Sequence, residues 1–216
     1  MDDDLPQLRI DEADAWYRAV PPPAVPMPAV NMPPDLHGER AILSDPGIGS
    51  IYDLRILGDV HRDSGGATVN VVPELDYWRT KVSPGKPVHP RTVPLEHVYI
   101  EHRVPYEPPS RDQLPHDPPR TGDADYLLRR IAPGPDQPGA RTPVPARTVG
   151  NIHGRRIIQA TPLGLAWDLR AISEPYETET HDIVVSLTSA HEYYRWVLTG
   201  SYPEPVPIDL HLLWTE

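Results

Sequence analysis

Alternating apolar and polar residues predict short strands in both halves of the chain. The clearest alternation covers residues 51–57 and returns at 165–172. In the second segment Leu165, Trp167, Leu169 and Ala171 are expected on one face of a strand, with Asp168 and Arg170 on the other. Further strands are predicted at 40–44 and 155–160, at 67–72 and 182–187, and at 96–104 and 208–214.

One segment carries a complete set of helix signals. Ser189 is expected to cap the helix at its start, Glu192 stands at the third helical position, and Gly200 provides the stop. These signals predict a helix of roughly ten residues. The corresponding segment ELDYWRTKVSPG, residues 74–85, has weaker caps and predicts a shorter helix.

The order of these segments suggests an internal duplication. The short sequences His37-Gly38 and Asp53-Leu54-Arg55 recur as His153-Gly154 and Asp168-Leu169-Arg170. His153 follows His37 at an offset of 116 positions. Weaker matches before, between and after them keep the same order. The alternative is that an Arg-, Pro- and Leu-rich composition makes short words recur by chance, but chance predicts no common order.

The predicted fold class follows from the duplication. We expect a β-rich α+β protein of two tandem repeated units, each with a small, mostly antiparallel sheet plus one helix and a long Pro-rich extended arm. The expected organisation is an N-terminal tail at 1–9, repeat unit 1 at 10–104, a Pro-rich linker at 105–120, and repeat unit 2 at 121–216.

Proline is the most unusual feature of the composition. The chain has 30 prolines in 216 residues, about three times the usual share. Two proline tracts, 21–34 and 132–145, occupy the same place in each expected unit. In the polyproline II conformation, such a tract spans about 43 Å. We therefore expect arms long enough to cross a domain or to reach a neighbouring subunit.

Charge and cysteine content narrow the function classes. The formal net charge of -11 and the absence of a basic cluster argue against a nucleic-acid partner. The chain has no cysteine, which excludes disulfides, thiolate catalysis and cysteine-ligated zinc. No apolar run is long enough to span a membrane, and the acidic start MDDDLPQLRI lacks the layout of a signal peptide. We expect a soluble protein that is not secreted through a cleaved leader.

The stretch HRDSGG, residues 61–66, looks like catalytic motifs of two enzyme classes. Its Asp-Ser-Gly-Gly matches the surroundings of a trypsin-like nucleophile, and its His-Arg-Asp matches a kinase catalytic loop. The protease interpretation needs a histidine and an aspartate on a preceding barrel. The kinase interpretation needs an asparagine five residues after the aspartate, but Asn70 comes seven after Asp63. A hairpin turn is the better interpretation.

No catalytic residue, metal site or cofactor is predicted, and the chain is not expected to be an enzyme. His37 and His153 are expected to anchor the arms through hydrogen bonds to arm carbonyls, the alternative being a twinned binding site. The repeated Asp-x-Arg pairs are expected to form ion pairs on the outer strand face or to contact an adjacent subunit. An aromatic residue such as Trp196 is either core packing or an interface anchor. The interface and structural candidates are His37, His153, Asp53, Arg55, Asp168, Arg170 and Trp196.

In style and composition, with its duplication, acidity, lack of cysteine and proline arms, the chain resembles virion structural proteins of long-tailed actinobacterial phages, particularly tail, tail-tip or connector components. The resemblance implies a non-enzymatic virion subunit that is assembled in the host cytoplasm. Its partners would be protein subunits of the same assembly, most simply in a homo-oligomeric ring, a trimer or a hexamer, with neither nucleic acid nor membrane as a partner.

Two other function classes stay open at this point. The first is an enzyme or small-ligand binding protein with its site between the two repeats, using His37, His153, Arg55 and Arg170. The second is an adaptor whose residues 105–119 bind SH3-like partners through proline motifs.

Overall fold

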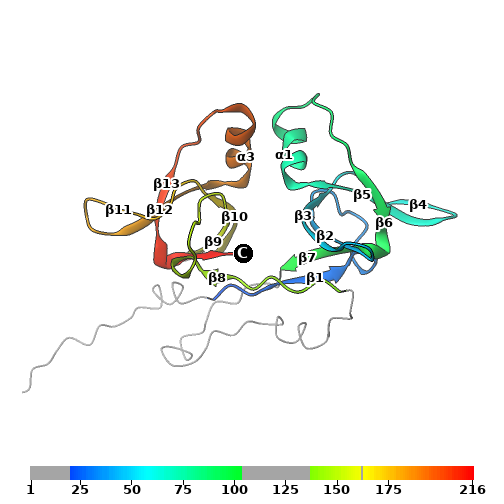
Figure 1. Ribbon diagram of the computed structural model, residues 1–216, viewed down its shortest axis with the longest axis horizontal. Coiled ribbons are helices and arrows are strands. Elements are labelled where there is room, and N and C mark those ends of the chain that lie inside the picture. Colours follow the sequence, from blue (N-terminus) through cyan, green and yellow to red (C-terminus); the bar gives the residue numbers. More distant parts are fainter. Residues whose placement is uncertain (1–19, 104–136, 162) are drawn as a thin grey trace, which may run out of the picture.

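The computed structural model describes residues 20–103, 137–161 and 163–216. These residues form a β-rich α+β structure with two seven-stranded sheets and two α-helices. In Figure 1 the two sheets lie at opposite sides of the molecule and the helices α1 and α3 stand beside each other between them. The expected tail at 1–9, the linker at 105–120 and the start of the tract 132–145 lie outside the described residues.

The first sheet is antiparallel throughout. Its strand order is β1-β7-β2-β3-β5-β4, and β6 also pairs with β5. Helix α1 connects β5 to β6. The elements are β1 (Ala24–Pro28), η2 (Ala29–Asn31), β2 (Arg40–Asp45), β3 (Gly49–Ile56), β4 (His61–Asp63), β5 (Gly66–Pro73), α1 (Glu74–Val82), β6 (Arg91–Pro94), η3 (Leu95–His97) and β7 (Val98–Arg103), where η marks a 3₁₀ turn.

The second sheet has the same strand order. Read from β8 it runs β8-β14-β9-β10-β12-β11, and β13 also pairs with β12. Helix α3 connects β12 to β13, as α1 connects β5 to β6. The elements are β8 (Val144–Pro145), η5 (Ala146–Thr148), β9 (Arg156–Thr161), β10 (Gly164–Ala171), β11 (Tyr176–Glu177), β12 (Ile183–Ser189), α3 (Ala190–Thr199), β13 (Val206–Asp209), η6 (Leu210–Leu212) and β14 (Leu213–Thr215).

Each sheet curls into a closed ring. In the first, β2 pairs with β3, β3 with β5, and β5 with β6, which leads through η3 into β7; β7 then pairs back with β2. The strand predicted at 96–104 is confirmed as β7 over Val98–Arg103, after a 3₁₀ turn at its first residues, whereas the single strand predicted at 208–214 is wrong. A 3₁₀ turn bends the chain there, because its two parts pair with different strands.

Each ring encloses its own apolar core. The first core includes Ile56, Val69 and Val98, and the second includes Ile157, Val185 and Leu213. All of these side chains are at most 2% exposed. The predicted strands thus bury their apolar faces inside two separate barrels, and the space between the barrels is left for other residues.

The predicted helix signals are confirmed in α3. The Ser189 Oγ accepts a hydrogen bond from the Glu192 N–H at 3.2 Å, and Gly200 ends the helix in the left-handed conformation with φ 79°. Helix α1 begins after Pro73 with no side-chain cap and is one residue shorter. The Trp78 ring of α1 stacks on the Tyr194 ring of α3 at 5.7 Å, so the two helices pack against each other.

A bulge interrupts the alternation predicted for 165–172. The register between β9 and β10 shifts between Ala166 and Leu169, and Asp168 has a positive φ of 57°. As a result the Trp167 ring lies outside the barrel core, 4.4 Å beneath the Arg103 guanidinium, and Arg170 is buried. Strand β3 has the same irregularity, with Asp53 at φ 61°.

The described part of the first proline tract lies on its own sheet. Residues 24–28 form β1, which pairs with β7 over five residues. Strand β1 is at the end of the strand order, a position that tolerates Pro26 and Pro28 because an edge strand needs hydrogen bonds on one side only. These residues therefore lie along their own sheet, and an arm that reaches a neighbouring subunit stays a prediction.

The stretch HRDSGG forms a hairpin turn, as predicted. Strands β4 and β5 pair from His61 to Thr68, and Ser64 and Gly65 make the tip. The Asp63 carboxylate accepts a hydrogen bond from the Gly65 N–H at 2.7 Å. Among the described residues, no helix is long and apolar enough to cross a membrane.

Candidate functional site

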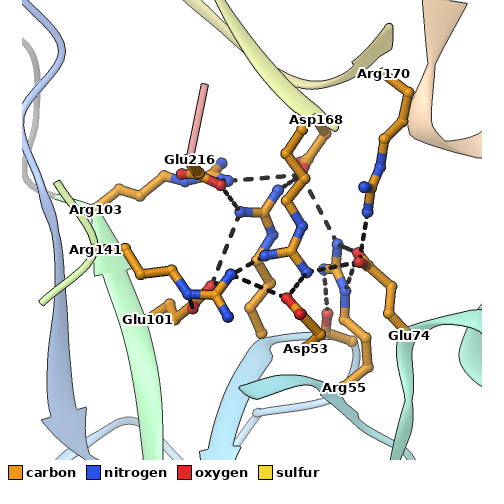
Figure 2. Close-up of polar contacts among 12 residues, drawn as sticks. Asp53, Arg55, Glu74, Glu101, Arg103, Arg141, Asp168, Arg170 and Glu216 are labelled. Carbon is orange, nitrogen blue, oxygen red and sulfur yellow. Dashed lines mark hydrogen bonds and ion pairs between the residues drawn. The ribbon is translucent and has the colours of Figure 1, made fainter. Parts of the chain in front are cut away.

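A network of charged side chains fills the space between the two barrels. Figure 2 shows it in close-up, with groups from both sheets pointing toward one another. We call this network the seam. Its members are Arg40, Asp53, Arg55, Glu74, Glu101, Arg103, Arg141, Arg156, Asp168, Arg170 and Glu216, joined by the Tyr194 hydroxyl.

Strand pairing places the four central arginines. Arg40 of β2 is directly opposite Arg55 of β3, and Arg156 of β9 is directly opposite Arg170 of β10. Each of the four is at most 8% exposed. Since the barrel interiors are apolar, these side chains project from the outer faces of the strands into the seam.

The ion pairs across the seam are reciprocal. Arg40 binds Asp168 at 2.6 Å, and Arg156 binds Asp53 at 2.9 Å. Each of these two arginines also faces a carboxylate at the far end of the other half: Arg40 binds Glu216 at 2.5 Å, and Arg156 lies 3.7 Å from Glu101. Corresponding residues thus make corresponding contacts in opposite directions.

Arginines from each half also lie on aromatic rings of the opposite half. The Arg103 guanidinium lies over the Trp167 ring at 4.4 Å, and the Arg141 guanidinium lies over the Tyr52 ring at 4.7 Å. Tyr52 and Trp167 each directly precede the bulged aspartate of their strand. Backbone joins the two halves as well, because Ala24 and Arg141 exchange hydrogen bonds of 3.0 and 3.1 Å.

The bulges in β3 and β10 carry the two aspartates of the seam. Asp53 and Asp168 both have left-handed backbone conformations, which are uncommon for a residue other than glycine, although aspartate is among the side chains that tolerate them. Burial alone would raise the pKa of Asp168, but the Arg40, Arg103 and Arg55 guanidiniums outweigh it and lower that pKa below its usual value. Both carboxylates are therefore ionised at neutral pH.

One contact explains the two words that recur in the sequence. Arg55 donates a hydrogen bond to the Gly38 carbonyl at 2.8 Å, and Arg170 donates one to the Gly154 carbonyl at 3.0 Å. Both glycines have a positive φ, and a Cβ on Gly38 would lie 2.7 Å from the Tyr77 hydroxyl. The glycine thus explains why the His-Gly pair recurs, because its carbonyl accepts the hydrogen bond from the arginine.

Glu74, the first residue of α1, is a carboxylate near the centre of the seam whose corresponding residue carries no charge. Its carboxylate binds Arg55 at 2.8 Å, Arg156 at 2.6 Å and Arg170 at 2.7 Å, and it is 4% exposed. The Tyr194 hydroxyl donates to it at 3.2 Å. Helix α3 begins with Ala190 at the corresponding place. A single carboxylate therefore neutralises arginines from both halves.

The environment of Glu74 keeps it charged. Burial by itself would raise the pKa of this carboxyl, but the guanidiniums of Arg156, Arg170 and Arg55 together hold the pKa far below its usual range. The neighbouring Tyr194 shows the opposite effect, since burial and the Glu74 charge raise the pKa of its hydroxyl to about 12. Glu74 is thus an ion-pair partner at neutral pH, and a carboxylate held in that state is a poor general acid.

The candidate residues predicted from the sequence lie in different parts of the structure, some in the seam and some outside it. It brings Asp53, Arg55, Asp168 and Arg170 together in the seam, where they contact the opposite half of the same chain. The histidines lie elsewhere. The His37 Nδ1 accepts from the Gly58 N–H at 2.9 Å, so its ring contacts the end of β3 and not an arm carbonyl.

Trp196 and His153 belong to an aromatic cluster on the outer side of α3. Their rings meet edge-on at 6.2 Å, and Trp196 also contacts Tyr193 and the half-exposed Tyr202. Trp196 thus packs beside its own barrel, away from the contact between α1 and α3.

Several seam residues were missed from the sequence, although some left a signal. Arg40 and Arg156 follow the two His-Gly pairs at the same distance, and Glu101 and Glu216 end two segments that align. Charged residues that recur in two aligned segments could have been paired with one another. Glu74 left no such signal, because its counterpart is Ala190.

The seam joins the two barrels through ion pairs between its own side chains. Within residues 20–103, 137–161 and 163–216, no group of three or more His, Asp or Glu side chains is placed to hold a metal ion. Comparison with protein-family models, with curated proteins and with solved structures finds no match to this chain.

Proposed function

We propose that the chain is a tandem duplication of one barrel-and-helix module and that it acts as a non-enzymatic structural subunit of a larger protein assembly. The observation that carries this proposal is the seam. Equal strand order in the two sheets, together with reciprocal ion pairs between them, is the arrangement of a symmetric dimer fused into one chain.

The charged side chains of the seam form ion pairs with one another. Arg40, Arg55, Arg156 and Arg170 all bind carboxylates, and the central carboxylate of Glu74 binds three of these arginines. An enzyme needs some groups left to meet a substrate, with pKa values near the working pH. This arrangement instead favours a rigid body that presents its outer surface to partners.

Two apolar side chains at corresponding hairpin tips support outward contacts. Ile48, between β2 and β3, is 73% exposed, and Leu163, between β9 and β10, is 100% exposed. Each directly precedes a glycine of positive φ. Large apolar side chains at matched exposed positions are suited to bury against neighbouring subunits.

The closest class in character is the phage virion, in which the chain would be a tail, tail-tip or connector component assembled in the host cytoplasm. A fused pair of modules lets a ring of three chains imitate six-fold symmetry, or a ring of six imitate twelve-fold. In this proposal the contacts between neighbouring chains are made by surfaces such as the hairpin tips, since the described part of the first proline tract is used within its own sheet.

Sedimentation velocity of the purified full chain tests this function. We expect species at multiples of 24.2 kDa whose share grows with concentration. The double variant Ile48→Lys/Leu163→Lys should shift the distribution toward the single chain. A matched double variant at other half-exposed valines, Val30→Lys/Val197→Lys, should shift it less. A wild-type chain that sediments only as a 24.2 kDa monomer at every concentration would count against an assembly role.

A further inference from the structure

Two hollows flank the seam at corresponding places in the two halves. The first, of about 210 Å³, is lined by Glu39, Arg40, Arg55, Glu101 and Asp168 among others. The second, of about 360 Å³, is lined by their counterparts Arg155, Arg156, Arg170, Glu216 and Asp53 among others. The pair provides an internal comparison, because the same framework surrounds both hollows.

The two hollows differ in charge. Glu39 in the first is replaced by Arg155 in the second. The first hollow has three arginines against three carboxylates, and the second has four arginines against three carboxylates. Those lining the first are Arg40, Arg55 and Arg103 with Glu39, Glu101 and Asp168; those lining the second are Arg141, Arg155, Arg156 and Arg170 with Asp53, Glu74 and Glu216. In a chain with a net charge of -11, the second hollow is a local excess of positive charge.

Donors in the second hollow are left without hydrogen-bond acceptors. Arg156 has a side chain only 7% exposed, and within the described residues its Nη1 is buried with no hydrogen-bond partner, 3.7 Å from the Glu101 carboxylate of the first hollow. The buried Nε of Arg170 is in the same state. A buried N–H without an acceptor is costly, but the first hollow has one as well, the Arg40 Nε, so the second hollow is set apart by its additional arginine, Arg155.

Arg155 stands at the exposed side of the same hollow. Its Nε donates to the Asn151 carbonyl at 2.8 Å, and in the described part of the chain its terminal nitrogens have no carboxylate partner. The planar guanidinium group suits two parallel hydrogen bonds to one carboxylate or phosphate. Arg155 and Arg156 are therefore placed to meet such a group from neighbouring positions of the chain.

We propose that the second hollow binds a small oxyanion, the carboxylate or phosphate group of a small molecule, through Arg155 and Arg156. The volume of the hollow is at the lower end of the range of small-molecule sites. Asp53, Glu74 and Glu216 remain paired with arginines of the seam, and the ligand binds the exposed Arg155 guanidinium, which none of these three carboxylates contacts. Binding occurs in one half only, because Glu39 repels an anion from the corresponding hollow.

Isothermal titration calorimetry on the full chain tests this site, with inorganic phosphate and acetate as separate probes at constant ionic strength. We expect one site per chain, and the tighter probe identifies which oxyanion the hollow prefers. The variant Arg155→Glu places in the second hollow the carboxylate that Glu39 supplies at the corresponding position of the first, and it should weaken binding by about tenfold or more. Arg62→Glu makes the same charge change at an exposed position in β4 and should leave the affinity unchanged.

Three results would overturn the proposal: no heat with either probe, equal affinity in wild type and Arg155→Glu, or an equal loss in Arg62→Glu. The last would mean that total charge and not the hollow governs binding. Circular dichroism of both variants shows whether they fold. This test is independent of assembly, since a monomer can bind the anion and an assembled chain can fail to bind it.

Discussion

At the scale of single residues, Glu74 is the point where the two halves of the seam differ. Near the centre of a symmetric interface, a carboxylate on each side would bring two like charges together in a buried place. Here one half supplies Glu74 and the other supplies Ala190, so one carboxylate serves Arg55, Arg156 and Arg170. A charge that is buried among three partners becomes costly when it is removed, because the partners stay behind.

Substituting Glu74 should therefore destabilise the whole fold. For Glu74→Gln we expect a loss of about 3–5 kcal/mol in the free energy of unfolding, since three buried guanidiniums lose their shared carboxylate. Urea unfolding followed by circular dichroism measures it. The control Glu96→Gln removes an exposed carboxylate and should change stability by about 0.5 kcal/mol or less. A Glu74→Gln protein as stable as the control would show that the arginines find other acceptors.

The same residue predicts a loss of stability in acid. The pKa of Glu74 is far lower in the folded protein than in the unfolded chain, so its contribution is present above the unfolded pKa of about 4.3 and falls as the pH drops below it. Asp53 and Asp168 act in the same direction. Urea midpoints measured from neutral pH downward should fall below about pH 4. The fall should be shallower in Glu74→Gln, and equal slopes in the two proteins would contradict this account.

At the scale of elements, local sequence signals predicted the helix and strands that depend on residues close together in the chain. The caps at Ser189 and Gly200 predicted α3, and alternation predicted most of the barrel strands. The bends at η3 and η6 and the edge strand β1 were not predicted. They depend on pairing with strands far along the chain, and the proline-rich sequence of β1 looks like an isolated arm until β7 lies beside it.

The cap of α3 can be tested directly. Ser189→Ala removes the hydrogen bond from the Glu192 N–H and should lower the free energy of unfolding by about 1 kcal/mol. Ser64→Ala makes the same chemical change at the exposed tip of the β4–β5 hairpin and should have almost no effect on stability. Urea unfolding of both variants separates a working cap from a general loss of a hydroxyl. Equal stabilities would mean that α3 does not depend on Ser189.

At the scale of the whole molecule, the seam is the feature that sequence reasoning found only in part. The repeated Asp-x-Arg words pointed to ion pairs, but a strand pattern alone does not tell whether the partner is a neighbouring strand, another chain or the other half of the same chain. The bulges at Asp53 and Asp168 decide it, because they place the carboxylates beside Arg156 and Arg40 of the opposite barrel.

A double-mutant cycle measures one contact across the seam. We expect Arg40→Ala and Asp168→Ala to be coupled by about 0.5–3 kcal/mol, the range found for residues that share a network. The matched cycle on Arg91 and Asp45 examines a pair within one sheet whose arginine is 54% exposed, and it should give less than about 1 kcal/mol. Additive effects of Arg40→Ala and Asp168→Ala would remove this ion pair from the forces that join the barrels.

The seam is expected to hold the two barrels together as one body without help from the chain between them. A specific protease site placed within residues 105–120, followed by complete cleavage, tests this directly. Sedimentation velocity at neutral pH should then show the two fragments moving together, and Glu74→Gln should make them separate more readily. Fragments that separate in the wild-type protein as soon as the linker is cut would contradict the account.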